Sequence, residues 1–282
     1  MLKNKTIIIT GGTGTFGTNF IEYILKKKIK VKKVIIFSRD EFKQTEMQNR
    51  FANNKFLNLR YFIGDIRDKD RLRMALEDVD IILHAAAIKH VPIAEYNPFE
   101  AIKTNVLGVQ NLIEVALEKN IEKFISLSTD KAAAPVNLYG ATKLCADKLV
   151  TSSQNIKGKK KTIFSVVRYG NVFGSRGSVV PKFIKDNKSV SELKITDLSM
   201  TRFSLSINKA IEVVMWAIKN SVGGEILIPK IPSYKLIDLA KAINPKVKLK
   251  IIGIRQGEKV HEEMITSMDS DNCYGFKEYF AI

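Results

Sequence analysis

The chain has 282 residues, of which 45% are hydrophobic and 27% charged, so it can bury a sizeable core and is not disordered, collagen-like or a disulfide scaffold. Its 46 Lys and Arg residues against 29 Asp and Glu give a net charge of +17, which favours an anionic partner of some kind. Two cysteines, three histidines and the absence of an apolar stretch approaching ~18 residues lead us to expect a cytoplasmic protein with no metal site and no membrane partner.

The first 170 residues alternate short β-branched runs with amphipathic segments. The predicted strands cover residues 6–10, 33–38, 60–64, 80–85, 123–129 and 162–169. The predicted helices cover residues 16–27, 41–51, 70–76, 98–119 and 136–153. Strands that alternate with helices of this length build βαβ units, so we predict an α/β fold with a doubly wound parallel sheet.

A glycine-rich loop follows the first predicted strand and opens the first helix. Its glycines have the spacing G-x-x-G-x-x-G over residues 11–17. Glycine lets the backbone turn sharply and approach a pyrophosphate, whose charge is stabilised at the helix N-terminus. The loop therefore predicts a Rossmann-like, dinucleotide-binding domain over residues 1–170, with contacts from Gly11, Thr13, Gly14, Thr15, Phe16 and Gly17.

The end of the second predicted strand bears on which dinucleotide is bound. An NAD enzyme places an acidic residue there for the ribose 2′-hydroxyl, whereas this chain has Ser38 and Arg39. A guanidinium matches a 2′-phosphate, and Lys43 is expected on the same face, so the pattern favours NADP. Asp40 is the residue that favours NAD.

Two later strand ends extend the predicted cofactor site. Asp65 and Ile66 follow the third strand and are expected to meet the adenine. Ala85, Ala86 and Ala87 follow the fourth strand and are small enough to let the cofactor lie close. His84, within an apolar run, is expected to be a core histidine.

The fifth predicted strand leads into a candidate catalytic group. It ends in Thr129-Asp130-Lys131, and Tyr139 and Lys143 follow at i and i+4 on a predicted helix. Such a pair shares one helix face, so the ammonium is expected to lower the tyrosine pKa from ~10 and let Tyr139 take a hydroxyl proton as a hydride leaves.

After residue 170 the elements become shorter, with frequent Gly and Pro. We predict that residues 171–282 form a smaller substrate-binding lobe, which does not fold independently because no Pro/Ser-rich linker precedes it. In an open α/β sheet this lobe would form the far wall of the crevice beyond the carboxyl ends of the strands. The planar donors of Arg202 and Arg255 would suit a diphosphate in this crevice, with Lys89 reaching the same place.

The chain resembles the extended short-chain dehydrogenase/reductase superfamily, and more narrowly the inverting UDP-N-acetylglucosamine 4,6-dehydratases that open pseudaminic acid biosynthesis. The narrower resemblance rests on residues 38–41, 84–92, 128–132, 137–143, 168–172, 174–177, 200–203 and 253–259. It extends from the first strand to Tyr279. Ala134, Ser199 and Ser204 depart from the family pattern, and the chain stops at Ile282 where relatives commonly continue.

The resemblance implies a reaction: the NADP-dependent, redox-neutral dehydration of UDP-N-acetylglucosamine with inversion at C5, giving a UDP-2-acetamido-2,6-dideoxy-L-arabino-hexos-4-ulose. It implies that Lys131 removes the C5 proton while Asp130 protonates the departing C6 hydroxyl. Asp130 must then start protonated and Lys131 neutral, which we expect desolvation to favour for both.

The resemblance also implies further binding residues. On the cofactor side they are Lys89, Leu127, Ser128, Tyr139, Lys143, Val172 and Arg176. On the substrate side they are Lys89, Lys131, Asn171, Val179, Thr196, Arg202, Arg255 and Glu258. Extended relatives imply a homo-oligomer, a dimer or hexamer, in which helices 98–119 and 136–153 pack against their copies. The stripe Val109, Leu112, Ile113 and Leu117 would face either the neighbour or the chain's own sheet.

Other functions remain open at this point. A retaining 4,6-dehydratase would place Asp-Glu at positions 130 and 131, and a nucleotide-sugar 4-epimerase needs no such acid and base. An NADP-sensing regulator often lacks the tyrosine. A nucleic-acid partner is not expected, because the basic run at residues 157–161 has no interleaved aromatics to stack bases.

Overall fold

The computed structural model describes residues 2–175, 178–189 and 192–282. In this part of the chain, nine strands form the main sheet in the order β13-β14-β10-β6-β5-β4-β1-β2-β3. From β10 to β3 all neighbours pair in parallel, whereas β14 and β13 pair antiparallel at the edge. Their bounds are β1 Thr6–Thr10, β2 Lys33–Ser38, β3 Leu59–Ile63, β4 Ile81–His84, β5 Lys123–Thr129, β6 Ile163–Tyr169, β10 Ile226–Pro229, β13 Tyr274–Gly275 and β14 Tyr279–Ala281. The predicted doubly wound α/β fold is confirmed.

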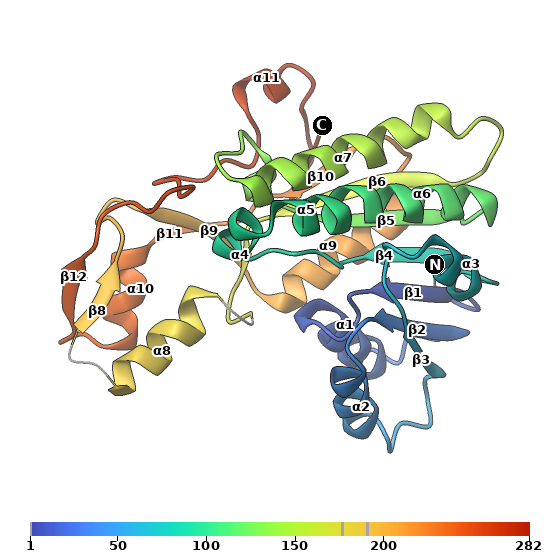
Figure 1. Cartoon of the computed structure of the whole chain (residues 1–282), viewed down its shortest axis with the longest axis horizontal. Helices are drawn as coiled ribbons and strands as arrows, with labels where there is room; N and C mark the ends of the chain where they lie inside the picture. Colours follow the sequence, from blue (N-terminus) through green and yellow to red (C-terminus); the bar gives the residue numbers. More distant parts are fainter. Residues whose placement is uncertain (1, 176–177, 190–191) are drawn as a thin grey trace.

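Helices cover both faces of this sheet. In Figure 1, α6 and α7 lie over one face and α1 and α9 over the other. The bounds are α1 Thr15–Lys26, α2 Glu41–Arg50, α3 Lys69–Ala75, α4 Val91–Tyr96, α5 Pro98–Ile102, α6 Gly108–Glu118, α7 Leu138–Ile156 and α9 Ile207–Asn220. Every residue of β1 is buried, as expected for a central strand covered on both sides.

The helix predicted over residues 98–119 is interrupted. A π-helical turn, η1 (Lys103–Leu107), separates α5 from α6. Asn105 in this turn is buried, and its side chain donates to the Ile88 carbonyl at 2.9 Å and to the Thr142 hydroxyl at 3.0 Å. The wider turn thus accommodates a polar anchor that apolar periodicity does not reveal.

The smaller lobe has its own core. It contains β8 (Glu192–Ile195) paired with β12 (Lys248–Ile251), and the helices α8 (Val179–Ser189) and α10 (Leu236–Ile243). Their apolar side chains form a cluster separate from the main core. A second sheet has three strands, β7 (Asn171–Val172), β9 (Thr201–Leu205) and β11 (Ser233–Lys235). In Figure 1, β9 and β11 lie between the smaller lobe and the main sheet.

The chain does not divide simply at residue 170. After β9 it returns to the main sheet through α9 and β10, and it ends there in β14. Ile226, Leu227 and Ile228 of β10 are buried in the main core. Burial of these apolar side chains stabilises the pairing of β10 with β6. Among the described residues, no helix is both long and apolar enough to cross a membrane.

Candidate active site

The glycine loop lies between the end of β1 and the start of α1. Gly11 has φ +64°, and a Cβ there would lie 2.8 Å from Ala86 Cα, so only glycine fits this turn against the loop after β4. A Cβ at Gly17 would lie 2.0 Å from the Gly12 carbonyl oxygen. Gly14 is the N-cap of α1 without a side-chain cap, and the first turn of α1 has no acidic residue. These features fit a pyrophosphate.

Ser38, Arg39, Asp40 and Lys43 lie at the neighbouring strand end, as predicted. Asp40 is the N-cap of α2 and pairs with the Lys43 amine at 2.5 Å, which holds the pKa of that carboxyl below its usual range. Arg39 precedes this cap and lies outside the helix, so the expectation that it shares a helix face with Lys43 is wrong. Its guanidinium lies 3.6 Å from Asp65 and is half exposed. Arg39 and Lys43 therefore have different acidic neighbours, Asp65 and Asp40.

The two residues that were predicted to meet the adenine follow β3. Asp65 is held by Arg67, which lies 2.7 Å from it and keeps the pKa of the carboxyl low despite partial burial. Ile66 is buried and packs against Gly108, where a Cβ would lie 2.8 Å from the Ile66 side chain. Ala85, Ala86 and Ala87 follow β4 beside the glycine loop, and Lys89 lies just beyond them on the exposed surface.

His84 is a core side chain, as expected. It is 1% exposed, and its Nδ1 lies 2.8 Å from the Thr10 hydroxyl. Burial lowers the pKa of His84 to about 3.

The candidate catalytic residues lie where β5 passes through a 3-10 turn, η2 (Asp130–Ala132), into α7. The Thr129 hydroxyl donates to Asp130 at 3.0 Å and accepts from the Lys131 backbone N–H at 3.3 Å, so it fixes the turn. A Cβ at Gly140 would lie 2.2 Å from the Lys131 carbonyl oxygen, so glycine lets α7 pack directly on η2. This packing brings Tyr139 beside Lys131.

Lys131 carries a charge in this site, contrary to expectation. Its amine lies 3.0 Å from Asp130 Oδ1 and 3.3 Å from Glu262 Oε1, and both carboxyl groups are buried. Burial would lower the pKa of Lys131, but Asp130 and Glu262 together raise it above its ordinary value. The expectation that desolvation keeps Lys131 neutral is therefore wrong, because it overlooked these two counter-charges.

Tyr139 also departs from expectation. Desolvation by the surrounding protein raises the pKa of Tyr139 to about 12, although Lys131 and a hydrogen bond with Thr129 act to lower it. The predicted lowering by Lys143 is wrong for the ligand-free protein. Lys143 is buried, and its amine donates to the Leu127 carbonyl at 2.8 Å.

A buried polar network below the site was not predicted. The Ser128 hydroxyl donates to Asp147 at 2.7 Å, and the Arg168 guanidinium lies 3.3 Å from the same carboxyl oxygen. Arg168 is 2% exposed and also donates to the Met264 carbonyl at 3.1 Å. Arg168 lies in a segment that carries the resemblance, but no local pattern pairs it with Asp147.

A cavity of about 350 Å³ opens between the main sheet and the smaller lobe. The predicted substrate residues that line it are Lys131, Asn171, Val179, Thr196, Arg202, Arg255 and Glu258. Val172 of the predicted cofactor set also lines it, Lys89 lies outside this lining, and Arg176 lies outside the described residues. The structure thus places Lys131 at the floor of a cavity with two arginines in its wall.

The guanidinium groups of Arg202 and Arg255 differ in how firmly the protein holds them. Arg202 donates to the backbone carbonyls of Thr201 and Val260, so its guanidinium is held in place. Arg255 is half exposed and lies 3.7 Å from Glu258. The segment that carries Arg255 is tied to α7, because the Asn137 side chain donates to the Gly257 carbonyl at 2.8 Å.

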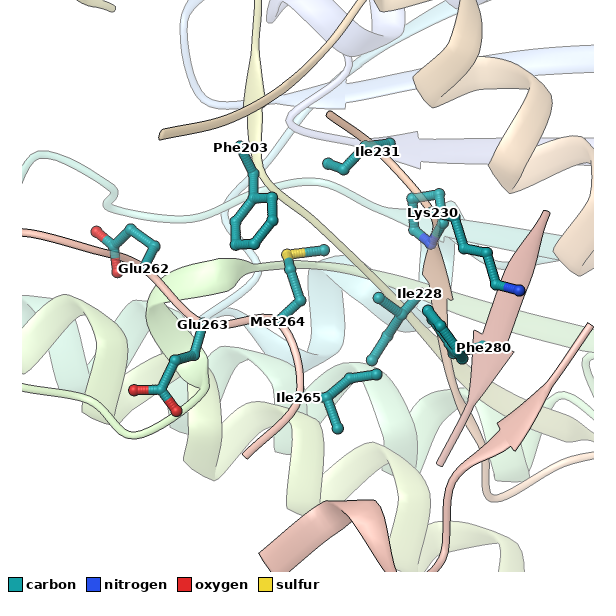
Figure 2. Close-up of a pocket in the computed structure, with 10 residues that line it drawn as sticks. Phe203, Ile228, Lys230, Ile231, Glu262, Glu263, Met264, Ile265 and Phe280 are labelled. Atoms are coloured by element: carbon teal, nitrogen blue, oxygen red, sulfur yellow. The ribbon is translucent and has the colours of Figure 1, made fainter. Parts of the chain in front are cut away.

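A second cavity, of about 470 Å³, lies beside the first and is shown in Figure 2. Phe203, Ile228, Met264 and Ile265 converge in it, so it is largely apolar. Glu262 lines both cavities. Sequence reasoning missed Glu262, which lies just past the last segment of the resemblance and far along the chain from Lys131.

Comparisons with known proteins show which family this chain belongs to. A family model described as "Polysaccharide biosynthesis protein" matches residues 7–282. The UDP-N-acetylglucosamine 4,6-dehydratase (inverting) of Campylobacter jejuni subsp. jejuni serotype O:23/36 is 55% identical, over 100% of this chain and 84% of that protein. A UDP-glucose 4-epimerase of Rickettsia bellii is 40% identical over the same shares. The X-ray structure of Pen from Bacillus thuringiensis matches with a TM-score of 0.95 and 41% identity, over 100% of this chain and 90% of that one.

Proposed function

Since this chain belongs to the polysaccharide biosynthesis protein family, as its resemblance to the inverting dehydratases predicted, we propose that it dehydrates UDP-N-acetylglucosamine across C4 to C6 with inversion at C5. The product is UDP-2-acetamido-2,6-dideoxy-L-arabino-hexos-4-ulose. The observation that carries the proposal is the contact of 3.0 Å between Lys131, which lines the cavity, and the buried Asp130, with Tyr139 close to Lys131.

NADP is the proposed cofactor. Arg39 and Lys43 follow Ser38, whose hydroxyl lies 3.1 Å from that of Thr13 in the glycine loop, and they supply cations that suit a 2′-phosphate, while Asp40 is engaged as a helix cap. When bound, the nicotinamide would supply reversible hydride transfer between itself and the sugar, so the reaction would involve no net oxidation.

The chain's own residues move the protons. Tyr139 acts as the phenolate, so its own phenol proton leaves before C4 is oxidised. The phenolate then takes the C4 hydroxyl proton as C4 becomes a ketone, which acidifies the C5 proton. Lys131 takes that proton, the C6–O bond breaks, and Asp130 gives its proton to the departing hydroxyl, which leaves as water. A solvent-derived proton completes C5 when C6 is reduced.

The salt bridge explains how the acid and base arise together. Lys131 is an ammonium in the ligand-free protein, so it cannot accept a proton. One proton transfer to Asp130, 3.0 Å away, makes Lys131 neutral and Asp130 protonated at once. Exclusion of water by the substrate would favour this neutral pair over the ionic pair.

A 4-epimerase is the second candidate, because relatives named UDP-glucose 4-epimerase are 40% identical to this chain. Epimerisation needs only C4 oxidation and reduction by Tyr139 and the cofactor. It gives the buried pair of Lys131 and Asp130 no task, and this favours the dehydratase.

Product analysis separates these functions. UDP-N-acetylglucosamine is incubated with the protein in deuterated water, and the sugar is followed by NMR. We expect a 4-keto-6-deoxy sugar with deuterium at C5 and the L-arabino configuration. A retained C5 configuration would indicate a retaining dehydratase, and a C4 epimer with its C6 hydroxyl intact would indicate an epimerase. Nucleotide released by denaturation should be NADP; mainly NAD would contradict the 2′-phosphate argument.

This reaction would be the first step of pseudaminic acid biosynthesis, in the cytoplasm. Both cysteines, Cys145 and Cys273, are free thiols, which suits a reducing compartment.

A further inference from the structure

Glu262 reaches the catalytic residues from a different part of the chain. It lies in the segment between β12 and α11 (Ser267–Ser270). In Figure 2 its carboxylate is directed away from the apolar side chains of the second cavity. The side chain is 5% exposed, and Oε1 lies 3.3 Å from the Lys131 amine.

Two carboxyl groups therefore converge on one ammonium. Asp130 Oδ1 and Glu262 Oε1 both contact Lys131, whereas Asp130 Oδ2 and Glu262 Oε2 are buried without a hydrogen-bond partner among the described residues. Among the residues that the structure describes, Lys131 is also the one cation within ion-pair distance of Glu262. A carboxylate buried with a single cationic contact is held in place by that contact.

We propose that Glu262 is a positioning residue, whose carboxylate holds the Lys131 ammonium at the floor of the cavity and keeps Lys131 protonated until it transfers its proton to Asp130. The role of Lys131 as a base rests on the proposed function. The ion pair between Lys131 and Glu262 does not depend on that function.

The groups that act on Lys131 come from three elements: Asp130 from η2, Tyr139 from α7 and Glu262 from the segment after β12. Asp130 and Glu262 are the two that stabilise the ammonium through ion pairs. Replacing Glu262 by Gln keeps the shape and removes one negative charge. Lys131 should then lose its proton at lower pH, by about one unit or more.

The direct test needs no turnover. Lys131 in the intact protein is labelled with trace acetic anhydride at a series of pH values, and its extent of acetylation is measured by peptide mass spectrometry. We expect Glu262→Gln to move the midpoint for Lys131 down by about one pH unit. The matched control is Glu263→Gln, because Glu263 is half exposed and lies 3.9 Å from Lys259 instead. Its midpoint should match wild type.

The second readout is the pH dependence of dehydration. In Glu262→Gln the basic limb of kcat/KM should move down with the labelling midpoint, because activity is lost when Lys131 and Asp130 lose the one proton they share, and kcat should fall about tenfold as Lys131 loses its fixed position. An unmoved midpoint, or a higher KM with an unmoved limb, would overturn the positioning role and make Glu262 a substrate contact.

Two further experimental outcomes bear on the proposal. If the Gln variant does not fold, Glu262→Asp keeps the charge with a shorter side chain and should show a smaller downward shift; no shift in a folded Asp variant would count against the proposal. If the midpoint moves but wild type does not dehydrate the substrate, the ion-pair role stands and the proposed function fails.

Discussion

Burial governs single residues in this site more strongly than neighbouring charge. Tyr139 has Lys131 and Thr129 beside it, yet its pKa rises to about 12 because the surrounding protein desolvates the phenolate. Lys131 is the exception, since two carboxyl groups outweigh its desolvation. Spacing in the sequence predicts which residues meet, but it does not give the balance between desolvation and charge.

His84 provides a stability prediction at this scale. Its pKa is lowered from 6.5 to about 3 in the folded protein, so between these values the unfolded chain binds a proton that the folded chain does not. Above pH 6.5 His84 is neutral in both states and does not lower the free energy of unfolding. Below pH 6.5 its burial makes that free energy fall with pH, by up to ~1.4 kcal/mol per pH unit. His84→Asn should flatten this part of the pH dependence.

Denaturant unfolding of both proteins at several pH values from 7 to 4 measures the effect. The difference between them isolates His84 from the carboxyl groups, which titrate in both. Parallel curves for wild type and His84→Asn would show that His84 is protonated in the folded state.

At the scale of elements, the contact of α7 with η2 sets the catalytic geometry. Gly140→Ala would place a Cβ 2.2 Å from the Lys131 carbonyl oxygen, so the two elements must separate. We expect a loss of about 1–3 kcal/mol in the free energy of unfolding. A displacement of about 1 Å at Lys131 and Tyr139 should lower kcat by about 100-fold.

Gly275→Ala is the matched control for this change. A Cβ at Gly275 would meet Phe280 at 3.7 Å, which is an ordinary contact, so activity and stability should stay near wild type. Wild-type activity in Gly140→Ala would show that the contact of α7 with η2 does not position the site.

Much of the element order was predictable, and the reasons are local. β1 is a run of buried β-branched residues, β2 has a buried β-branched centre, and the glycine loop follows directly after β1. The π turn at Lys103–Leu107 was not predictable, because it depends on the tertiary hydrogen bonds of Asn105. Glu262 was missed for a similar reason, since only folding of the smaller lobe brings it to Lys131.

At the scale of the whole molecule, the structure redirects the assembly prediction. Val109, Leu112 and Ile113 are buried in the chain's own core, so they cannot face a neighbour. Large apolar side chains are instead exposed on α4, α5 and η1: Tyr96 at 86%, Phe99 at 75% and Leu107 at 47%. An exposed apolar group of this kind is typical of an interface.

We therefore expect a homo-oligomer, at least a dimer, formed through α4, α5 and η1. Phe99→Glu should place a charge in the interface and shift the mass measured by light scattering to that of a monomer. Met268→Glu, at an equally exposed apolar residue on α11, should leave the mass unchanged. A monomeric wild type at working concentration would remove this prediction.

The most direct test of the central claim is deuterium incorporation at C5 by Lys131→Ala. The variant should bind cofactor and substrate and show some reduced-nicotinamide absorbance, because Tyr139 can still support C4 oxidation. Its C5 exchange and dehydration should fall by about 10²–10⁴-fold, as for loss of a general base. Lys148→Ala, at an exposed lysine on α7, is the matched control and should behave as wild type. Normal dehydration and normal C5 exchange by Lys131→Ala would contradict the account.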